Sequence, residues 1–209
     1  MAQDFQYPTA ASTQRRSFAF SGGFFRDRLV HRILTLAGAR PRFGLPQRDD
    51  QVLIWGKRPV SWRGRSVATR RDCDLLHVED AFLRSVLPGR MGDAPHGLLL
   101  DRRGCHFDRS IVSDLEDILQ NHPLDDRELL SRARAAMADI ARTKLTKYCA
   151  VPETPPDVPD DCVVVIDQTR GDASIESAGA TAYSFAQALE FARTEFPDSP
   201  ITIKTHPET

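Results

Sequence analysis

Residues 162–204 read CVVVIDQTRGDASIESAGATAYSFAQALEFARTEFPDSPITIK, and this stretch decides the fold class. Its apolar run at 162–167 predicts a buried strand, residues 182–195 predict a helix, and residues 201–204 predict a second strand. The connection between the strands is long enough for a right-handed parallel crossover. Because such β-α-β units build α/β sheets, we expect an α/β protein with a Rossmann-like lobe here.

The sequence before residue 151 predicts a second set of strands and helices. The expected strands are 52–56, 74–78, 98–101 and 105–108, the last two forming a hairpin around Arg102-Arg-Gly104. The expected helices are 24–36, one that begins after Ser113, where Glu116 would complete a capping box, and 126–147. This alternation again indicates an α/β lobe.

A segment between the two sets can continue neither a helix nor a strand. Residues 151–161 contain four prolines and four acidic residues, and proline interrupts helices and resists strand pairing. We interpret this segment as a linker between lobes at 18–150 and 162–209. Residues 1–17 are polar and patternless, and we expect a disordered tail. A lobe with only two strands cannot close its core, so the second lobe is expected to be incomplete.

The charge is unevenly distributed along the chain. The net charge is -1, yet 14 of the 28 Lys and Arg residues lie within residues 1–71, against four of the 29 Asp and Glu residues. This basic front favours an anionic partner, such as a phosphate-rich membrane surface or a nucleotide-sugar donor. Nothing in the sequence resembles an element that reads nucleic acid, so no nucleic-acid partner is expected.

Several common motifs are missing from the sequence. The four cysteines are widely spaced and form no CxxC, which argues against zinc and disulfides and fits a reducing compartment. The sequence contains no GxGxxG, Walker, GxSxG, HExxH or EF-hand pattern, so neither a cofactor nor a metal is expected. It shows no signal peptide and no 18-residue apolar run, and we expect a cytoplasmic protein.

The basic helix at 24–36 has two interpretations. Phe25, Leu29, Val30, Ile33 and Leu34 recur at helical spacing, with arginines on the other faces. The helix could lie on anionic lipid with its apolar face in the membrane interface. It could instead pack that face on its own lobe and leave its arginines in water, which is the commoner arrangement.

Three polar clusters directly follow predicted strands. They are Glu79-Asp80 with Arg84, Asp167-Gln168 with Asp172, and Lys204 with His206. Ligands of open α/β sheets bind beyond the carboxyl ends of the strands, so these clusters are the candidate site.

Each cluster also has a purely structural interpretation. Asp172 could cap a following helix. Arg84 could form a bridge with Glu79 or Asp80, and His206 could be a hydrogen-bonded loop residue. The position of any one residue does not decide between these interpretations, and three clusters together favour a site.

An ordered set of motifs resembles a known family. The matching stretches are Gly23-Phe-Phe-Arg26, Leu53-Ile-Trp-Gly56, Val78-Glu-Asp-Ala-Phe-Leu-Arg-Ser-Val86, Leu100-Asp101, Phe107-Asp108, Ser113-Asp-Leu-Glu116, Arg132-Ala-Arg134, Thr146-Lys-Tyr148, 168–175 and Lys204-Thr-His-Pro207. In this order they resemble the bacterial β-Kdo transferases of capsule polysaccharide biosynthesis and export. Kdo is 3-deoxy-D-manno-oct-2-ulosonic acid. The resemblance runs from about residue 23 to residue 208.

The resemblance implies an activity, partners and an architecture. It implies a retaining glycosyltransferase that moves Kdo from CMP-Kdo to a lipid-linked acceptor at the inner membrane, with peripheral membrane contact. It also implies a GT-B-like pair of Rossmann-type lobes, the second being the start of the nucleotide-sugar-binding lobe. Two alternatives stay open: a transferase for another CMP-activated ulosonic or sialic acid, and an inactive lobe that binds glycolipid or a partner.

The resemblance also implies roles for the candidate residues. Asp172 would be the nucleophile that makes retention possible by double displacement. Glu79 would be the base that activates the acceptor hydroxyl. His206 would bind the CMP moiety, helped by Lys204, while Asp80 and Gln168 would also bind substrate. Arg84 would hold the Kdo carboxylate or fix the acidic pair in place.

Overall fold

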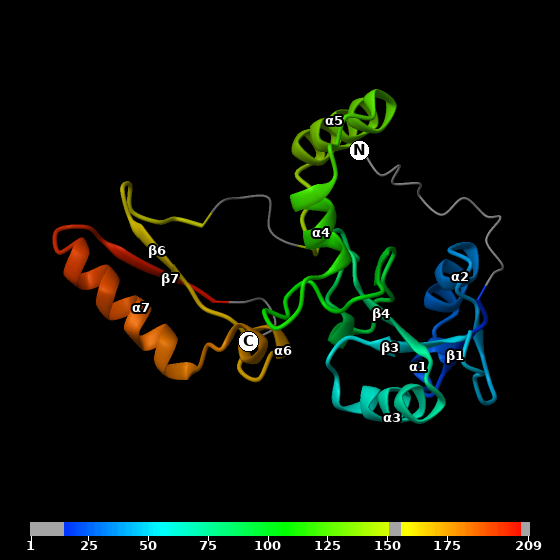
Figure 1. Cartoon of the computed structure of the whole chain (residues 1–209). Helices are drawn as coiled ribbons and strands as arrows, with labels where there is room; N and C mark the ends of the chain where they lie inside the picture. The colour runs from blue at the N-terminus through cyan, green and yellow to red at the C-terminus, as the bar shows by residue number, and fades with distance from the viewer. Residues whose placement is uncertain (1–14, 151–155, 206–209) are drawn as a thin grey trace. The chain divides into compact units, whose positions relative to one another are not determined.

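The computed structural model describes residues 15–150 and 156–205 (Figure 1). The chain divides into two compact units, and each is described by itself. The first comprises residues 1–106 and 111–150, and the second comprises residues 107–110 and 151–209. Residues 1–14 of the expected tail and 151–155 of the expected linker lie outside the described residues. Arg15, Arg16 and Ser17 are described, and Ser17 already begins a strand.

The first unit is built on a five-stranded sheet. Its strands are β1 (Ser17–Ala19), β2 (Pro41–Arg42), β3 (Gln51–Trp55), β4 (Asp74–Asp80) and β5 (Leu98–Asp101). Their order is β2-β1-β3-β4-β5, with parallel pairing except between β4 and β5. The strands predicted at 52–56 and 74–78 are confirmed as β3 and β4. This is the mixed α/β, Rossmann-like sheet that the sequence predicted.

Five helices and two short 3₁₀ segments complete this unit. The helices are α1 (Gly23–Arg26), α2 (Arg28–Leu36), α3 (Trp62–Arg71), α4 (Asp114–Asn121) and α5 (Arg127–Thr143), and the 3₁₀ segments are η1 (Pro59–Ser61) and η2 (Gly89–Met91). Figure 1 shows α2 and α3 on opposite sides of β3. The alternation of side chains along β3 explains this layering. Leu53 packs with the helices α1 and α2, whereas Val52 and Ile54 pack with α3.

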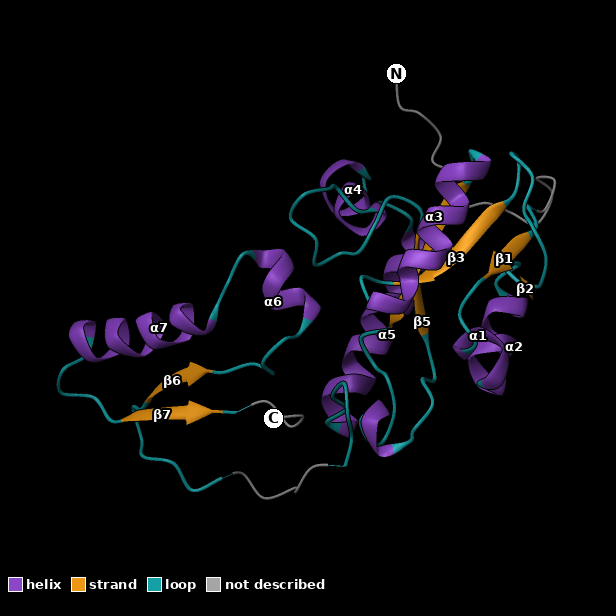
Figure 2. Ribbon diagram, turned by 90° about the horizontal axis from the view of Figure 1, so that it is seen from below, coloured by secondary structure: helices purple, strands orange, loops and turns teal. Residues whose placement is uncertain are grey.

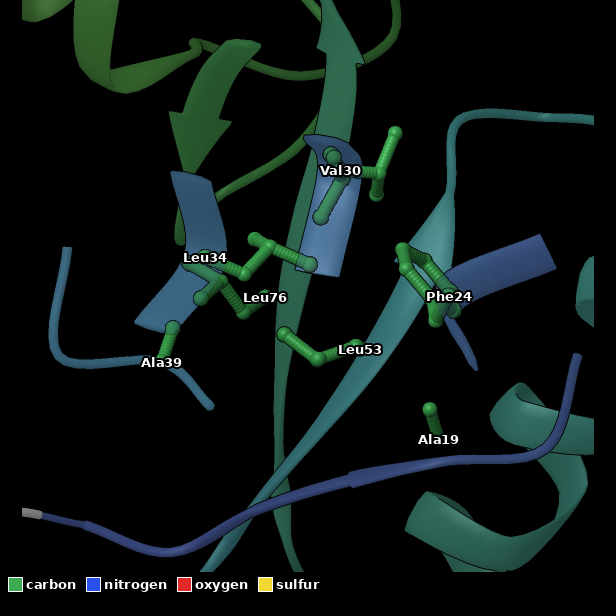
Figure 3. Close-up of a cluster of buried hydrophobic side chains, with 8 residues drawn as sticks. Ala19, Phe24, Val30, Leu34, Ala39, Leu53 and Leu76 are labelled. Atoms are coloured by element: carbon green, nitrogen blue, oxygen red, sulfur yellow. The ribbon is translucent and has the colours of Figure 1, made fainter. Parts of the chain in front are cut away.

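The larger core cluster shows what the apolar face of the basic helix packs against. Phe24, Val30 and Leu34 are buried against β1, β3 and β4, as Figure 3 shows for their side chains. The apolar face of these helices therefore packs on the protein's own sheet, which is the second of the two interpretations of the basic helix. The single helix predicted at 24–36 is in fact two. The Asp27 carboxylate accepts hydrogen bonds from the backbone N–H groups of Leu29 and Val30 and so begins α2.

The predicted hairpin around Arg102-Arg-Gly104 is wrong. β5 pairs with β4, and residues 105–108 form no strand. The cause is Asp101, whose buried carboxylate binds four backbone N–H groups, those of Arg103, Gly104, Asp114 and Leu115. One oxygen closes the turn after β5 and the other meets the start of α4, so the chain leaves the sheet.

We expect Asp101→Ala to lower the free energy of unfolding by about 2–4 kcal/mol, because it leaves several buried donors without their acceptor. Urea titration at neutral pH measures this change. Asp139→Ala is the matched control, since Asp139 is exposed and pairs with Arg142 on the surface of α5. Equal midpoints for the two variants would contradict this role of Asp101.

The helices after β5 agree in part with the sequence prediction. α4 begins after Ser113, whose hydroxyl accepts a hydrogen bond from the N–H of Glu116 at 3.1 Å. α5 ends at Thr143, earlier than predicted, because Lys144 takes the left-handed conformation with φ 52°. No side chain of α5 is buried, and Met137 is 68% exposed.

The second unit contains the β-α-β arrangement that decided the fold class. β6 (Val163–Ile166) and β7 (Ile201–Lys204) pair in parallel, as predicted. The helices between them are α6 (Ala173–Ala178) and α7 (Ala182–Glu195), and α7 matches its predicted bounds. Figure 2 shows α7 lying along the two strands. Val164 and Ile166 remain about half exposed.

Candidate active site

One group of candidate residues lies at the carboxyl edge of the five-stranded sheet. Glu79 and Asp80 are the last two residues of β4. The neighbouring parallel strand β3 ends beside them, since Trp55 is in register with Val78. The chain order reverses between β1 and β3, which is where open α/β sheets bind ligands. The predicted position of the acidic pair at a strand end is confirmed.

The carboxylate of Glu79 has a strongly altered affinity for protons. The pKa of Glu79 is raised to about 7, first by burial and then by the neighbouring charge of Asp80, against the lowering effects of Arg58, of a hydrogen bond from the backbone of Asp80 and of Lys147. A carboxylate with a pKa near neutrality is half-deprotonated at the pH of the cell and can accept a proton from a hydroxyl. Glu79 is therefore suited to act as a general base.

Gly56 makes room for this carboxylate. A Cβ at position 56 would lie 1.6 Å from Oε1 of Glu79 and 2.7 Å from its Cδ. Gly56 also has φ 43°, in the region that side chains disfavour, and its N–H donates to the carbonyl of Val78 at 3.1 Å. The glycine that closes the β3 run therefore holds Glu79 against the backbone, which the sequence alone did not reveal.

We expect Gly56→Ala to displace Glu79 and to cost about 2–4 kcal/mol of stability through the clash and the backbone strain. The pKa of Glu79 should fall towards its ordinary value as the carboxylate moves out to water, and a ¹³C NMR titration of glutamate-labelled protein measures it. Gly92→Ala is the control, since Gly92 also has a positive φ, 99°, but an added Cβ would meet no atom within 4 Å there. An unchanged Glu79 titration in Gly56→Ala would contradict the packing role.

Asp80 and Arg84 form a buried ion pair. Nε of Arg84 donates to Oδ2 of Asp80 at 2.9 Å, and Nη1 donates to Oγ of Ser85 at 2.7 Å and to the carbonyl of Asp93 at 2.9 Å. Through these contacts Arg84 is able to fix the acidic pair in place. The other oxygen of Asp80, Oδ1, is buried and has no hydrogen-bond partner within the described part of the chain. Such an acceptor is suited to a ligand hydroxyl.

A distant segment of the chain packs beside this cluster. The carbonyl of Lys147 accepts from the N–H of Arg84 at 3.1 Å, and Tyr148 forms a parallel bridge with Ser85. The motif 146–148 therefore lies next to the motif that contains Glu79, and the ammonium of Lys147 acts on the Glu79 carboxylate. Both motifs belong to the set that resembles the transferase family, but the sequence does not show that they lie side by side.

A separate group of candidate residues lies in the second unit. Asp172 caps α6: its Oδ1 accepts from the N–H of Ser174 at 2.8 Å and from its hydroxyl at 2.6 Å. Gln168 follows β6, and Lys204 ends the adjacent strand β7, so these two lie at neighbouring strand ends. Asp172, Gln168 and Lys204 are exposed. His206 lies outside the described residues.

The structure thus brings the candidate residues together as two groups. Glu79, Asp80 and Arg84 form one cluster in the first unit, and Gln168, Asp172 and Lys204 belong to the second. Within the described residues, no group of three or more His, Cys, Asp or Glu side chains could hold a metal ion. No described helix is long and apolar enough to cross a membrane.

Comparison with known proteins places this arrangement in a family context. No family model matches the chain. A capsule polysaccharide modification protein LipA from Neisseria meningitidis serogroup A is 31% identical over 94% of this chain. The lipopolysaccharide-processing protein LpsZ of Rhizobium meliloti is 29% identical over 75% of it. The chain spans only 29% and 36% of the length of these two relatives.

Solved structures give a more specific comparison. The β Kdo 2,4 transferase of Thermosulfurimonas dismutans KpsC superposes with a TM-score of 0.82 and 26% identity, covering 94% of this chain and 62% of that one. The β Kdo 2,7 transferase of the same protein superposes with a TM-score of 0.61 at 20% identity, which shows the shared fold.

The chain is thus an α/β protein with a Rossmann-like sheet that matches the fold of a β Kdo 2,4 transferase. The resemblance to the capsule polysaccharide β-Kdo transferase family is confirmed over nearly the whole chain.

Proposed function

We propose that this chain is part of a retaining glycosyltransferase that moves Kdo from CMP-Kdo to a lipid-linked acceptor in capsule polysaccharide biosynthesis. One observation carries the proposal. The chain shares its fold over 94% of its length with a β Kdo 2,4 transferase at 26% identity. The buried carboxylate of Glu79, with its pKa of about 7, adds support because acceptor activation requires such a base.

The reaction would proceed through two displacements. The Asp172 carboxylate attacks the anomeric carbon of Kdo, the bond from that carbon to the phosphate oxygen breaks, and CMP leaves with the electron pair. The acceptor hydroxyl then attacks the same carbon, Glu79 takes its proton, and the Asp172 carboxylate is released. Two inversions give net retention. A phosphate monoester needs positive charge or hydrogen-bond donors rather than a proton to depart, and Lys204 and His206 would supply them.

The remaining candidate residues would orient the substrates. The unpartnered Oδ1 of Asp80 would accept a hydrogen bond from a sugar hydroxyl beside Glu79. Arg84 would hold Asp80 in position rather than bind the Kdo carboxylate, because its Nε and Nη1 already donate within the protein. Gln168 would contact the donor near the nucleophile.

We also infer that the two units are the two lobes of a GT-B-type enzyme and that the second lobe is incomplete here. Each unit contains parallel strands with helices between them. Among its described residues the second unit has two strands, and Val164 and Ile166 leave apolar surface in water. Rossmann-type lobes cover both faces of their sheet, so further strands and helices would complete this one.

Peripheral contact with the inner membrane is part of the proposal. The docked helix α2 cannot supply it through its apolar face. The end of α2 and the segment that follows it are better suited, since Leu36, Phe43 and Leu45 are strongly exposed and the exposed Arg40 and Arg42 lie between Leu36 and Phe43 in the sequence. Exposed apolar side chains among arginines favour an anionic lipid surface.

The decisive assay incubates the full-length gene product with CMP-Kdo and a synthetic lipid-linked acceptor and measures Kdo in the lipid fraction. Competition with other CMP-activated ulosonic or sialic acids tests the rival donor class. Preferred transfer of Kdo supports the proposal. Preference for another donor selects the first alternative, and acceptor binding without turnover of any donor selects the binding module.

A further inference from the structure

A buried thiol lies behind the candidate base. Cys105 is 2% exposed, and its Sγ lies 3.6 Å from Nδ1 of His77 and 4.0 Å from Oε1 of Glu79. His77 is itself buried. The three side chains thus form a continuous polar chain in the interior, and the catalytic scheme above uses only its last member.

The fold explains why these three side chains meet. His77 and Glu79 are two residues apart on β4, so they point to the same face of the sheet. Cys105 arrives from the neighbouring strand: β5 ends at Asp101, whose carboxylate closes the turn at Arg103 and Gly104 and so directs the next residue inward. The placement of Cys105 therefore depends on the turn that the Asp101 carboxylate closes.

We propose that Cys105 and His77 are positioning residues for Glu79, holding Oε1 so that Oε2 receives the proton of the acceptor hydroxyl. The inference rests on the proposed function of Glu79 as base. It goes beyond that function because it assigns roles to two residues that contact neither the donor nor the acceptor.

The hydrogen atoms can be assigned consistently along this chain. His77 in the tautomer with hydrogen on Nδ1 donates to Sγ of Cys105, and the thiol S–H points at Oε1 of Glu79. Oε1 also packs on the backbone at Gly56. One carboxylate oxygen is thus fixed from two sides, which limits rotation of the carboxylate and keeps the base in a single orientation.

Other roles for the thiol fit the surroundings less well. A side chain that is 2% exposed cannot attack a substrate, so Cys105 is no nucleophile here. The charged groups that face Glu79 are Asp80 on the same strand, Arg58 after β3 and Lys147 from the segment after α5. The backbone N–H of Asp80 also hydrogen-bonds to the Glu79 carboxylate, and Cys105 is a buried side chain within reach of Oε1 itself.

The test compares Cys105→Ala and Cys105→Ser with Cys73→Ala, a control thiol that bonds to the backbone of Gln47 away from Glu79. In glutamate-labelled protein, the ¹³C signal of Glu79 is assigned by its loss in Glu79→Gln. Removing a donor to the carboxylate should raise the pKa of Glu79 by about half a unit in Cys105→Ala, and Cys105→Ser should restore most of it. This readout needs no activity.

The kinetic readout follows in the transfer assay. Cys105→Ala should lower kcat about tenfold with little change in KM, and its pH profile should move with the NMR titration. A Glu79 titration in Cys105→Ala that matches Cys73→Ala overturns the inference, and so does a fall in kcat without any shift in the titration. Absence of transfer by the wild type would instead refute the proposed function and leave the titration as the test of positioning.

Discussion

The Asp172→Asn variant is expected to lose Kdo transfer by roughly 10³–10⁵-fold while its fold stays intact. Asparagine cannot form the covalent intermediate that retention requires, yet it caps helices as well as aspartate does. It can therefore keep the hydrogen bond from the N–H of Ser174 that begins α6. The assay is transfer from CMP-Kdo to the lipid acceptor, with circular dichroism and thermal unfolding alongside.

The chain offers a matched control for this exchange. Asp126 is likewise a helix-capping aspartate, its Oδ1 accepting from the N–H of Leu129, three residues on, at 2.9 Å at the start of α5. Asp126→Asn should leave transfer unchanged, because it makes the same replacement in a helix-capping residue that has no proposed role in the reaction. If Asp172→Asn retained near wild-type transfer, Asp172 would be a helix cap and nothing more.

The Glu79→Gln variant is expected to lose transfer by roughly 10²–10⁴-fold and to become more stable at neutral and alkaline pH. Glutamine keeps the size of the side chain but cannot take the proton of the acceptor hydroxyl. In the wild type, transfer should rise with pH through about 7 as Glu79 loses its proton. In the variant this ionisation should disappear from the pH profile.

The gain in stability follows from the same carboxylate. The pKa of Glu79 is about 7 in the folded protein against 4.5 ordinarily. Between these values the folded state binds more protons than the unfolded state, so the wild type loses stability as pH rises from about 4.5 to 7. The loss amounts to about 3 kcal/mol, and Glu79→Gln escapes it. Urea unfolding across this pH range measures the difference.

Glu190→Gln is the control for both measurements, because Glu190 is exposed on α7. It should change neither transfer nor the pH dependence of unfolding. If Glu79→Gln destabilised the protein equally at every pH, the carboxylate would be ordinary in its proton affinity. The role of Glu79 as a base at neutral pH would then be wrong.

Local patterns were sufficient to predict most of the framework. The apolar runs at β3, β4, β6 and β7 and the periodicity of α7 are strong signals, because strand and helix burial repeat at fixed spacings. The positions of Glu79, Gln168 and Lys204 at strand ends followed from those runs. The sequence did not predict that Asp27 separates two helices. An aspartate within a helical pattern looks like any solvent-facing residue, and only the structure shows that its side chain caps a new helix.

The features that the sequence could not predict depend on contacts between distant residues. The hairpin prediction failed at Asp101 because its carboxylate satisfies backbone donors as far along the chain as Leu115. The approach of Gly56 to Glu79 and the packing of Cys105 behind it likewise join separate strands and loops. Propensity and periodicity describe neighbours in sequence, so such contacts appear only in the folded structure.

Double displacement at Asp172 is tested by intact-protein mass spectrometry of the full-length Glu79→Gln variant after mixing with CMP-Kdo, followed by peptide mapping. With the base removed, the second displacement slows, and a covalent Kdo adduct is expected on the peptide that contains Asp172. Product formed by the wild type with inverted configuration, or an adduct on any residue other than Asp172, would contradict it.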